Sequence, residues 1–149
     1  MLDDIDRKLL ELLQEDGRKT AKDAAEQVAM SIPATAERIR RLVDGGYIHD
    51  FRAVVDPKKV GYDVTSFILV VMSSSAYYEE LVRHAKESNE ILECHSITGE
   101  GSHLLKVRLK DTSALEGLLR KIQSWEGVLR THTMVVMSTF KEETHLSIS

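Results

Sequence analysis

The arginines Arg38, Arg40 and Arg41 stand close together in the stretch 31–42, and their guanidinium groups can bind phosphate or the edge of a guanine base. If this stretch is a helix with Ile39 and Leu42 facing inward, its spacing places Arg40 to the side. The residues expected on its exposed side are Pro33, Ala34, Glu37, Arg38 and Arg41. Because Pro33 and Ala34 are small, they would allow close approach to a DNA groove.

The alternative is that these charges are simply the solvated face of a short helix, which the arginine count alone favours. The order of the surrounding elements favours DNA instead. Three short helices with a tight turn before the third form a helix-turn-helix arrangement, whose last helix enters the major groove.

A second candidate is the loop 98–102, Thr-Gly-Glu-Gly-Ser, which lies between two predicted strands. Its free backbone N–H groups suit a small carboxylate or a zwitterion. A plain hairpin loop is the alternative, and the residues alone favour it.

Other kinds of site find less support. Cys94, His95, His103 and His132 match no zinc-binding spacing, so ordinary strand side chains are the better interpretation. The sequence has no nucleophile elbow, zinc-protease motif or P-loop, and we predict no cofactor and no catalysis.

The 149 residues carry 20 Lys and Arg against 24 Asp and Glu, a net charge of −4, so any contact with DNA must be local. The apolar run 67–72 is too short to cross a bilayer, and the N-terminus, Met-Leu-Asp-Asp, does not resemble a leader. A single cysteine forms no internal disulfide. These features predict a cytoplasmic protein without membrane contact.

The first half is predicted to be helical. Asp3 caps a first helix with an apolar stripe, Thr20 opens a second helix with a capping-box spacing, and Ser31 caps a third that ends at Gly45 and Gly46. The β-branched and aromatic stretch 47–55 predicts a connecting strand. We therefore expect a helix-turn-helix, winged-helix-like domain with a linker strand over residues 1–62.

The second half, residues 63–149, alternates strands and helices. Strands are expected at 64–73, 91–98, 103–110 and 128–139, and helices at 76–87 and from a capping box at Ser113. The order βαββαβ is that of the ferredoxin-like fold, an α+β sandwich. Both faces of the first and last strands are largely apolar, so a second subunit is expected to cover the open face of the sheet.

Together these fragments resemble the Lrp/AsnC family of prokaryotic transcription factors over essentially the whole chain. The segments that carry the resemblance are 2–10, 14–18, 31–42, 46–48, 55–56, 60–61, 98–99, 104–105 and 135–137. The resemblance implies a DNA-binding regulator that forms homodimers and often tetramers or octamers. It also implies an amino acid or related effector between dimers.

Site residues follow from combining the helix-turn-helix pattern with this resemblance. The residues expected at DNA are Lys19, Thr20, Lys22, Ser31, Pro33, Ala34, Thr35, Arg38, Arg40 and Arg41, with a place in the core as the alternative for Thr35. The resemblance places the effector at Thr98, Gly99, Glu100, Gly101, Ser102, His103, Val135, Val136 and Met137. The family loop often reads Gly-x-x-Asp before an aromatic residue, and this loop lacks that aspartate. Two alternatives follow: Glu100 substitutes for it, or the protein binds no amino acid and acts architecturally.

Two other functions remain open from the sequence. Siroheme decarboxylases share a similar two-domain plan, and such an enzyme would need a cleft built from His95, His103, Arg130 and His132. The acidic net charge also permits a ligand-sensing module that does not bind DNA.

Overall fold

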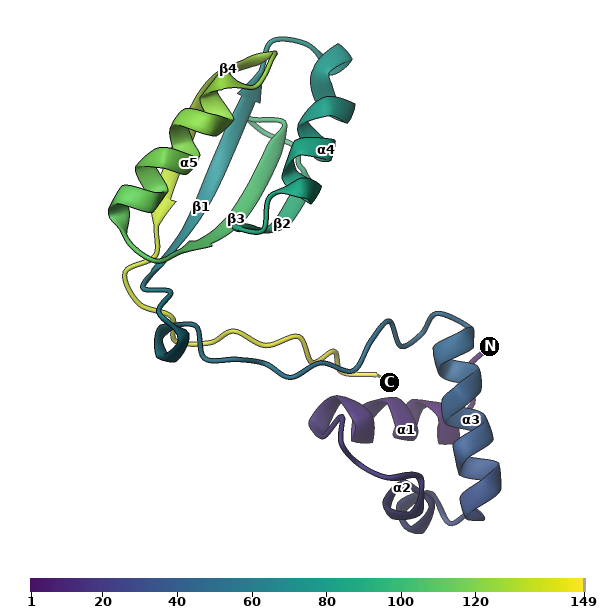
Figure 1. Cartoon of the computed structure of the whole chain (residues 1–149). Coiled ribbons are helices and arrows are strands. Elements are labelled where there is room, and N and C mark those ends of the chain that lie inside the picture. The colour runs from purple at the N-terminus through teal and green to yellow at the C-terminus, as the bar shows by residue number, and fades with distance from the viewer. Residues whose placement is uncertain (149) are drawn as a thin grey trace. The chain divides into compact units, whose positions relative to one another are not determined.

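A computed structural model describes residues 1–148, which form two compact units (Figure 1). The first comprises residues 1–54 with the C-terminal tail from Lys141, and the second comprises Val55–Phe140. No helix among the described residues has the length and apolar character needed to span a membrane.

The first unit contains three helices, α1 (Asp4–Glu15), α2 (Ala21–Val28) and α3 (Ile32–Asp44). All three predicted N-caps are confirmed. The side chain of Asp3 accepts a hydrogen bond from Asp6 N, that of Thr20 from Asp23 N, and that of Ser31 from Ala34 N. Each cap satisfies a donor that the helix itself leaves free. The turn between α2 and α3 is made by Ala29 in the left-handed conformation, with φ 55°.

The helices of the first unit enclose a small core. Its buried residues are Leu9, Leu10, Ala24 and Leu42, with partly buried apolar neighbours that include Ile39 and Ile148. Ile148 comes from the C-terminal tail, so this core uses both ends of the chain.

The predicted connecting strand over 47–55 is wrong. This stretch has no regular structure, and a short 3₁₀ turn, η1 (Lys58–Val60), follows it. Tyr47, Phe51 and Val54 are exposed. The composition favours a strand, but a strand also needs a hydrogen-bonded neighbour, and none lies beside these residues in the described part of the chain.

The C-terminal tail binds α1 through side chains one turn apart. Glu11 accepts hydrogen bonds from Ile148 N at 2.5 Å and pairs with His145 Nε2 at 2.7 Å. Gln14 donates to Leu146 O at 2.8 Å and accepts from Leu146 N at 2.7 Å. The hydrogen bond from Ile148 N, followed by the one with His145, lowers the pKa of Glu11. No pattern in the sequence predicts these contacts of the tail.

Deleting residues 141–149 should therefore destabilise the helical unit. Loss of the Ile148 packing and of the backbone contacts is expected to lower its free energy of unfolding by about 1 to 2 kcal/mol, measured by denaturant titration of helical circular dichroism. Leu146→Ala is the matched control, because Leu146 is exposed and is held only through its main chain. An unchanged midpoint after the deletion would show that the tail contributes nothing.

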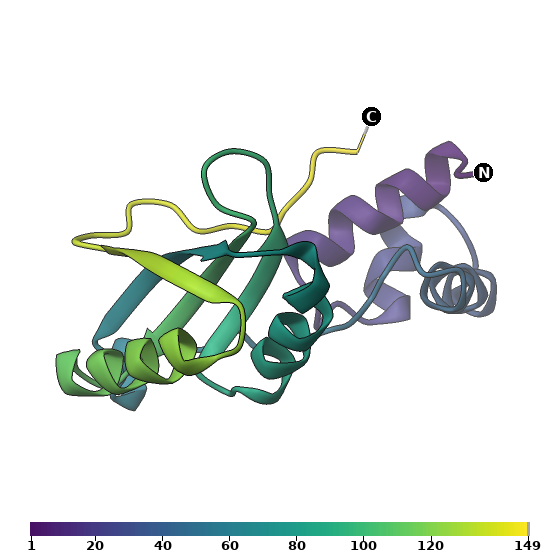
Figure 2. The ribbon, with the colours of Figure 1, turned by 90° about the horizontal axis from the view of Figure 1, so that it is seen from above.

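The second unit is a four-stranded antiparallel sheet with two helices. Its strands are β1 (Val64–Met72), β2 (Ile91–Ser96), β3 (His103–Leu109) and β4 (Val128–Val135), in the order β2-β3-β1-β4. The 3₁₀ turn η2 (Ser75–Tyr77) leads into α4 (Tyr78–Glu87), and α5 (Thr112–Ser124) precedes β4. Figures 1 and 2 show both helices on the same face of the sheet, which confirms the predicted ferredoxin-like fold.

Element boundaries in the second unit differ from the prediction by up to four residues. The side chain of Asp111, rather than that of Ser113, caps α5 by accepting from Ala114 N at 2.8 Å. The last strand ends at Val135 instead of residue 139.

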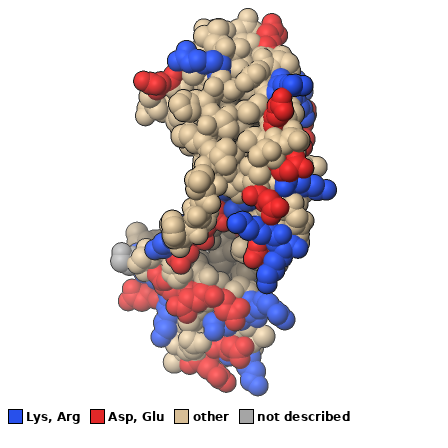
Figure 3. All heavy atoms as spheres, turned by 90° about the vertical axis from the view of Figure 1, so that its left-hand side faces the viewer, with Lys and Arg blue, Asp and Glu red and all other residues tan. Residues whose placement is uncertain are grey.

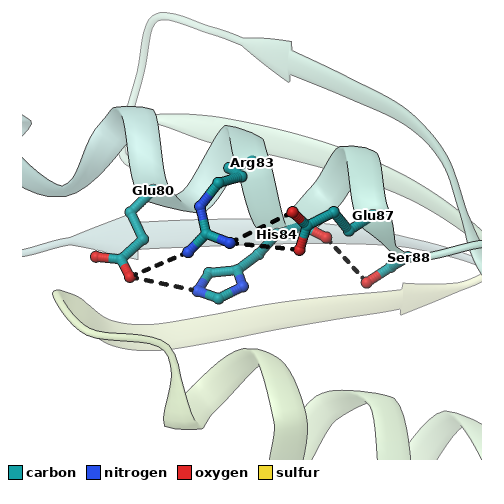
Figure 4. A network of polar contacts seen from close by, with 5 residues as sticks. All are labelled: Glu80, Arg83, His84, Glu87 and Ser88. Atoms are coloured by element: carbon teal, nitrogen blue, oxygen red, sulfur yellow. Dashed lines mark hydrogen bonds and ion pairs between the residues drawn. The ribbon is translucent and has the colours of Figure 1, made fainter.

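The core of the second unit lies between the sheet and the helices. Its fully buried residues include Ile68, Leu81, Leu105 and Ile122. On the exposed side of α4, Arg83 contacts both Glu80 and Glu87 at 3.4 Å (Figure 4). The ring of His84, on the same helix, stacks on Trp125 with centroids 4.9 Å apart.

Candidate nucleic-acid interface and ligand-binding loop

The outward face of α3 carries charges of both signs. Arg40 contacts Glu37 at 2.6 Å and Asp44 at 3.1 Å, and its side chain is 63% exposed. The hydrogen bond from Arg40 lowers the pKa of Glu37. Arg41 is exposed, and it has no ion pair within 4 Å among residues 1–148. It is therefore the arginine of α3 that is best placed to meet an external anion.

Three expectations about α3 need correction. Thr35 is fully buried, and its hydroxyl donates to Ser31 O at 2.9 Å, so it does not face DNA. Arg38 is mostly buried against carboxylates of α1, and Arg40 points outward rather than sideways. At about 100° per residue, Arg38 lies only about 60° around the helix from Thr35, whereas Arg40 lies about 140° away. Because Thr35 sets the core direction, Arg38 falls beside the core.

The other candidates lie at the starts of α2 and α3. Thr20 and Ser31 are exposed N-caps, Lys22 is exposed, and Lys19 is half-buried. Pro33 is exposed and Ala34 is half-buried in the first turn of α3.

The loop between β2 and β3 has an anchored side and an exposed side. Ser102 N donates to Val70 O at 3.0 Å, and Ile97 N donates to Ser102 O at 2.9 Å. Gly101 is buried against Leu69: a Cβ added there would lie 2.5 Å from Leu69 Cδ1 and 3.0 Å from Val70 O. The tip, residues 98–100, is exposed. The loop is thus fixed on the end of β1 and leaves its tip available to a ligand.

Gly101→Ala should disturb this anchor. We expect overpacking against Leu69 to lower the free energy of unfolding by about 1 to 3 kcal/mol, measured by thermal or denaturant unfolding. Gly117→Ala is the matched control, because a Cβ at Gly117 meets nothing within 4 Å and helix α5 should tolerate or gain from alanine. Equal stability of the two variants would contradict the tight contact at Gly101.

His103 does not lie on the ligand-accessible side of this loop, contrary to expectation. It is 2% exposed, and its ring meets that of Tyr78 edge-on with centroids 4.8 Å apart. Burial lowers the pKa of His103 and so favours the neutral ring, whose Nδ1 lies 2.8 Å from Ser102 Oγ. His103 supports the loop from the core.

The two predicted effector segments do not meet within one chain. In the sheet register, Val70 pairs with His103, next to the loop, whereas Ser66 pairs with Val135. Val136 continues from there, with its N–H donating to Thr65 O. Four residues of strand separate the two positions by about 13 Å. Val135, Val136 and Met137 therefore lie near one end of β1 and the loop lies at the other.

The face of the sheet opposite the helices is largely apolar along β1, and on β3 it carries Lys106 and Arg108 as well as Leu104. We define this open face by Phe67, Leu69, Val71, Leu104 and Met134, which alternate with the helix-facing core residues. On β4 the same face also carries Arg130 and His132, so the expectation of two apolar faces is confirmed for β1 and is wrong for β4. Figure 3, seen from the β4 side, shows a broad uncharged surface on this unit.

No cluster of three or more His, Cys, Asp or Glu residues in the described part of the chain is arranged to hold a metal ion. The four residues considered for such a cluster are dispersed: His103 is in the core, Cys94 is half-buried, and His95 and His132 are exposed.

Comparisons with known proteins agree with this architecture. Residues 65–146 match the model of the Lrp/AsnC ligand binding domain, and residues 2–49 match a winged helix-turn-helix DNA-binding model. The chain is 36% identical over 148 residues to the HTH-type transcriptional regulator FL11 of Pyrococcus furiosus, covering 99% of this chain and 97% of that protein. It is 33% identical over 150 residues to the leucine-responsive regulatory protein of Escherichia coli, covering 99% and 92%.

Solved structures show the same fold. The feast or famine regulatory protein of Mycobacterium tuberculosis, complexed with L-methionine, superposes with a TM-score of 0.93 at 31% identity over all of both chains. A transcriptional regulator of Neisseria meningitidis, also in complex with L-Met, gives 0.92 at 30% identity, covering 98% of this chain and 96% of that one.

Proposed function

This chain belongs to the Lrp/AsnC family of DNA-binding transcriptional regulators, and from this premise we propose how it binds DNA, assembles and senses a ligand. Residues 1–62 bind DNA, and residues 63–149 provide assembly and effector binding, with the tail from Lys141 packing on the helical unit. The protein works in the cytoplasm, without catalysis and without a cofactor.

The observation that supports DNA binding most directly is the placement of Arg41. It is exposed, without an ion pair among the described residues, on a helix that follows a tight turn and has the small residues Pro33 and Ala34 in its first turn. In this geometry Arg41 contacts a base edge or a phosphate in the major groove. The residues that line the adjacent DNA backbone are Lys19, Thr20, Lys22 and Ser31, with Arg40 at the edge of the contact.

Assembly uses the open face of the sheet. Phe67, Leu69 and Leu104 lie there beside one another in register, and a second copy covers them. The resulting homodimer supplies a second recognition helix, and further pairing of dimers gives tetramers or octamers. Two half-sites bound together compensate for the small number of free cations on each α3.

The effector is an amino acid. Two structural relatives are complexes with L-methionine, and the exposed tip 98–100 offers backbone N–H groups to a carboxylate. The loop lacks the aspartate that is common in the family, and Glu100, the carboxylate within the loop, takes its role and holds the effector's ammonium group. Because Val135, Val136 and Met137 lie at the far end of β1, another copy of the chain supplies them to the site.

The first experiment is a salt-series binding assay with the protein's own upstream DNA. A sequence-specific DNA-binding protein is expected to lose affinity steeply as the salt concentration rises, and its complex should survive addition of nonspecific competitor DNA. Absence of binding at every salt concentration, with and without a mixture of the twenty amino acids, would overturn the proposal and favour a sensing module without DNA binding.

A further inference from the structure

Arg38 connects the start of α1 to the middle of α3. One of its nitrogens, Nη1, lies 2.6 Å from Asp3 Oδ2 and 2.9 Å from Asp6 Oδ1. The same two aspartates form the capping box of α1, in which Asp6 N donates to Asp3 Oδ1 at 2.8 Å and Asp3 N donates to Asp6 Oδ2 at 3.3 Å. Both carboxylates therefore serve the cap with one oxygen and Arg38 with the other.

The ion pairs of Arg38 are largely shielded from solvent. The side chains of Arg38 and Asp6 are only 19% and 18% exposed. Figure 1 shows the N-terminal end of α1 beside α3, where this contact is made. A charged hydrogen bond with reduced solvent access fixes geometry better than an exposed ion pair does.

We propose that Arg38 is a positioning residue for DNA recognition: Asp3 and Asp6 hold it so that α3 presents Arg41, and Arg38 itself contacts no DNA. The inference rests on the proposed function, in which α3 enters the groove. Two carboxylates around one guanidinium leave a local charge of −1, which disfavours the approach of a phosphate.

The position of Arg41 explains why this contact matters. Arg41 lies one turn after Arg38, and both line a cavity of about 390 Å³ together with Asp3, Asp6 and Tyr47. Anchoring α3 at Arg38 limits rotation and sliding of the helix against α1. The side chain one turn further along is thereby held in a defined place.

The opposite interpretation is that Arg38 leaves the carboxylates and binds a phosphate. The two interpretations predict opposite changes in DNA affinity when Asp3 and Asp6 are neutralised. If Arg38 positions α3, neutralising the aspartates removes the anchor and weakens DNA binding. If Arg38 binds DNA, neutralising them removes its competitors and tightens binding.

The test compares Arg38→Gln, Arg38→Lys and the double variant Asp3→Asn/Asp6→Asn by fluorescence anisotropy on the bound upstream DNA over a salt series. Asparagine keeps the N-cap of α1 while removing the charge. Arg41→Gln is the matched control on the same helix, and it should reduce the slope of log affinity against log salt by about 0.9.

We expect Arg38→Gln and the aspartate double variant each to lose affinity about tenfold with the wild-type slope, and Arg38→Lys to recover part of the loss. Combining Arg38→Gln with the double variant should add little, because all three residues form one unit. Circular dichroism melts confirm that each variant compared is folded.

A slope reduced by about 0.9 in Arg38→Gln, tighter binding by the aspartate variant, or unchanged affinity in both would overturn the inference. Each of these results can be obtained only if the wild-type protein binds DNA. Failure of the wild type to bind would instead overturn the proposed function, so the two failures are distinguishable.

Discussion

Replacing Phe67 with lysine is expected to convert the protein to a monomer and to weaken its binding to DNA with two half-sites by about a hundredfold or more. Phe67 lies on the open face of β1, between Lys106 on β3 and Met134 on β4. In a symmetric pair of sheets, each copy would bury a new lysine beside Lys106, whose partner Glu93 at 3.5 Å would then face two cations. Light scattering measures the assembly, and anisotropy measures the affinity.

Ser113→Lys is the control for the added charge, because Ser113 is exposed in the first turn of α5, on the side of the sheet that carries the helices. It should leave both mass and affinity unchanged. If Phe67→Lys kept the wild-type mass, the open face would not be the interface, and the dimer would have to use another surface.

Arg41→Ala is expected to reduce affinity for the specific site by about 10- to 100-fold, equivalent to about 1 to 3 kcal/mol. Arg41 is the arginine of α3 without an ion pair in the described structure, so its loss removes an available cation and leaves the fold intact. If Arg41 reads a base, the preference at that base should relax, which binding to a panel of single-base variants would show.

Arg40→Ala is the comparison for this prediction. Arg40 is on the same outward face but is occupied by Glu37 and Asp44, so its removal should cost less affinity than the removal of Arg41. Equal footprints and affinity in Arg41→Ala and wild type would remove Arg41 from the interface.

Local features of the fold were predictable because they depend on neighbouring residues. A cap needs only a short polar side chain and a free N–H two or three residues later, and so Asp3, Thr20 and Ser31 were identified correctly. The same logic misplaced the start of α5, because Asp111 and Ser113 are both acceptable caps and the sequence does not choose between them. The strand predicted over 47–55 is wrong because strand formation also requires a second segment to pair with, which the composition of one segment does not reveal.

The candidate site was less predictable, since it depends on contacts between distant residues. Ile39 and Leu42 define the inward face of α3 correctly, but Arg38 lies beside that face and not on the exposed side where the helix spacing was taken to place it. The aspartates at the start of the chain were read only as a cap, although a second role could be suspected from two acids facing a helix rich in arginine. The separation of Val135 from the loop required the register of β1 with both its neighbours.

The contact between the tail and α1 makes the helical unit discontinuous in sequence, because it is built from two separate segments of the chain. The chain leaves this unit after Val54 and returns at Lys141, so after one break between residues 47 and 63 the described contacts that join the two fragments would be those of the tail. Because these contacts contribute only about 1 to 2 kcal/mol, limited proteolysis there would yield two fragments that separate on a sizing column as well as on a denaturing gel.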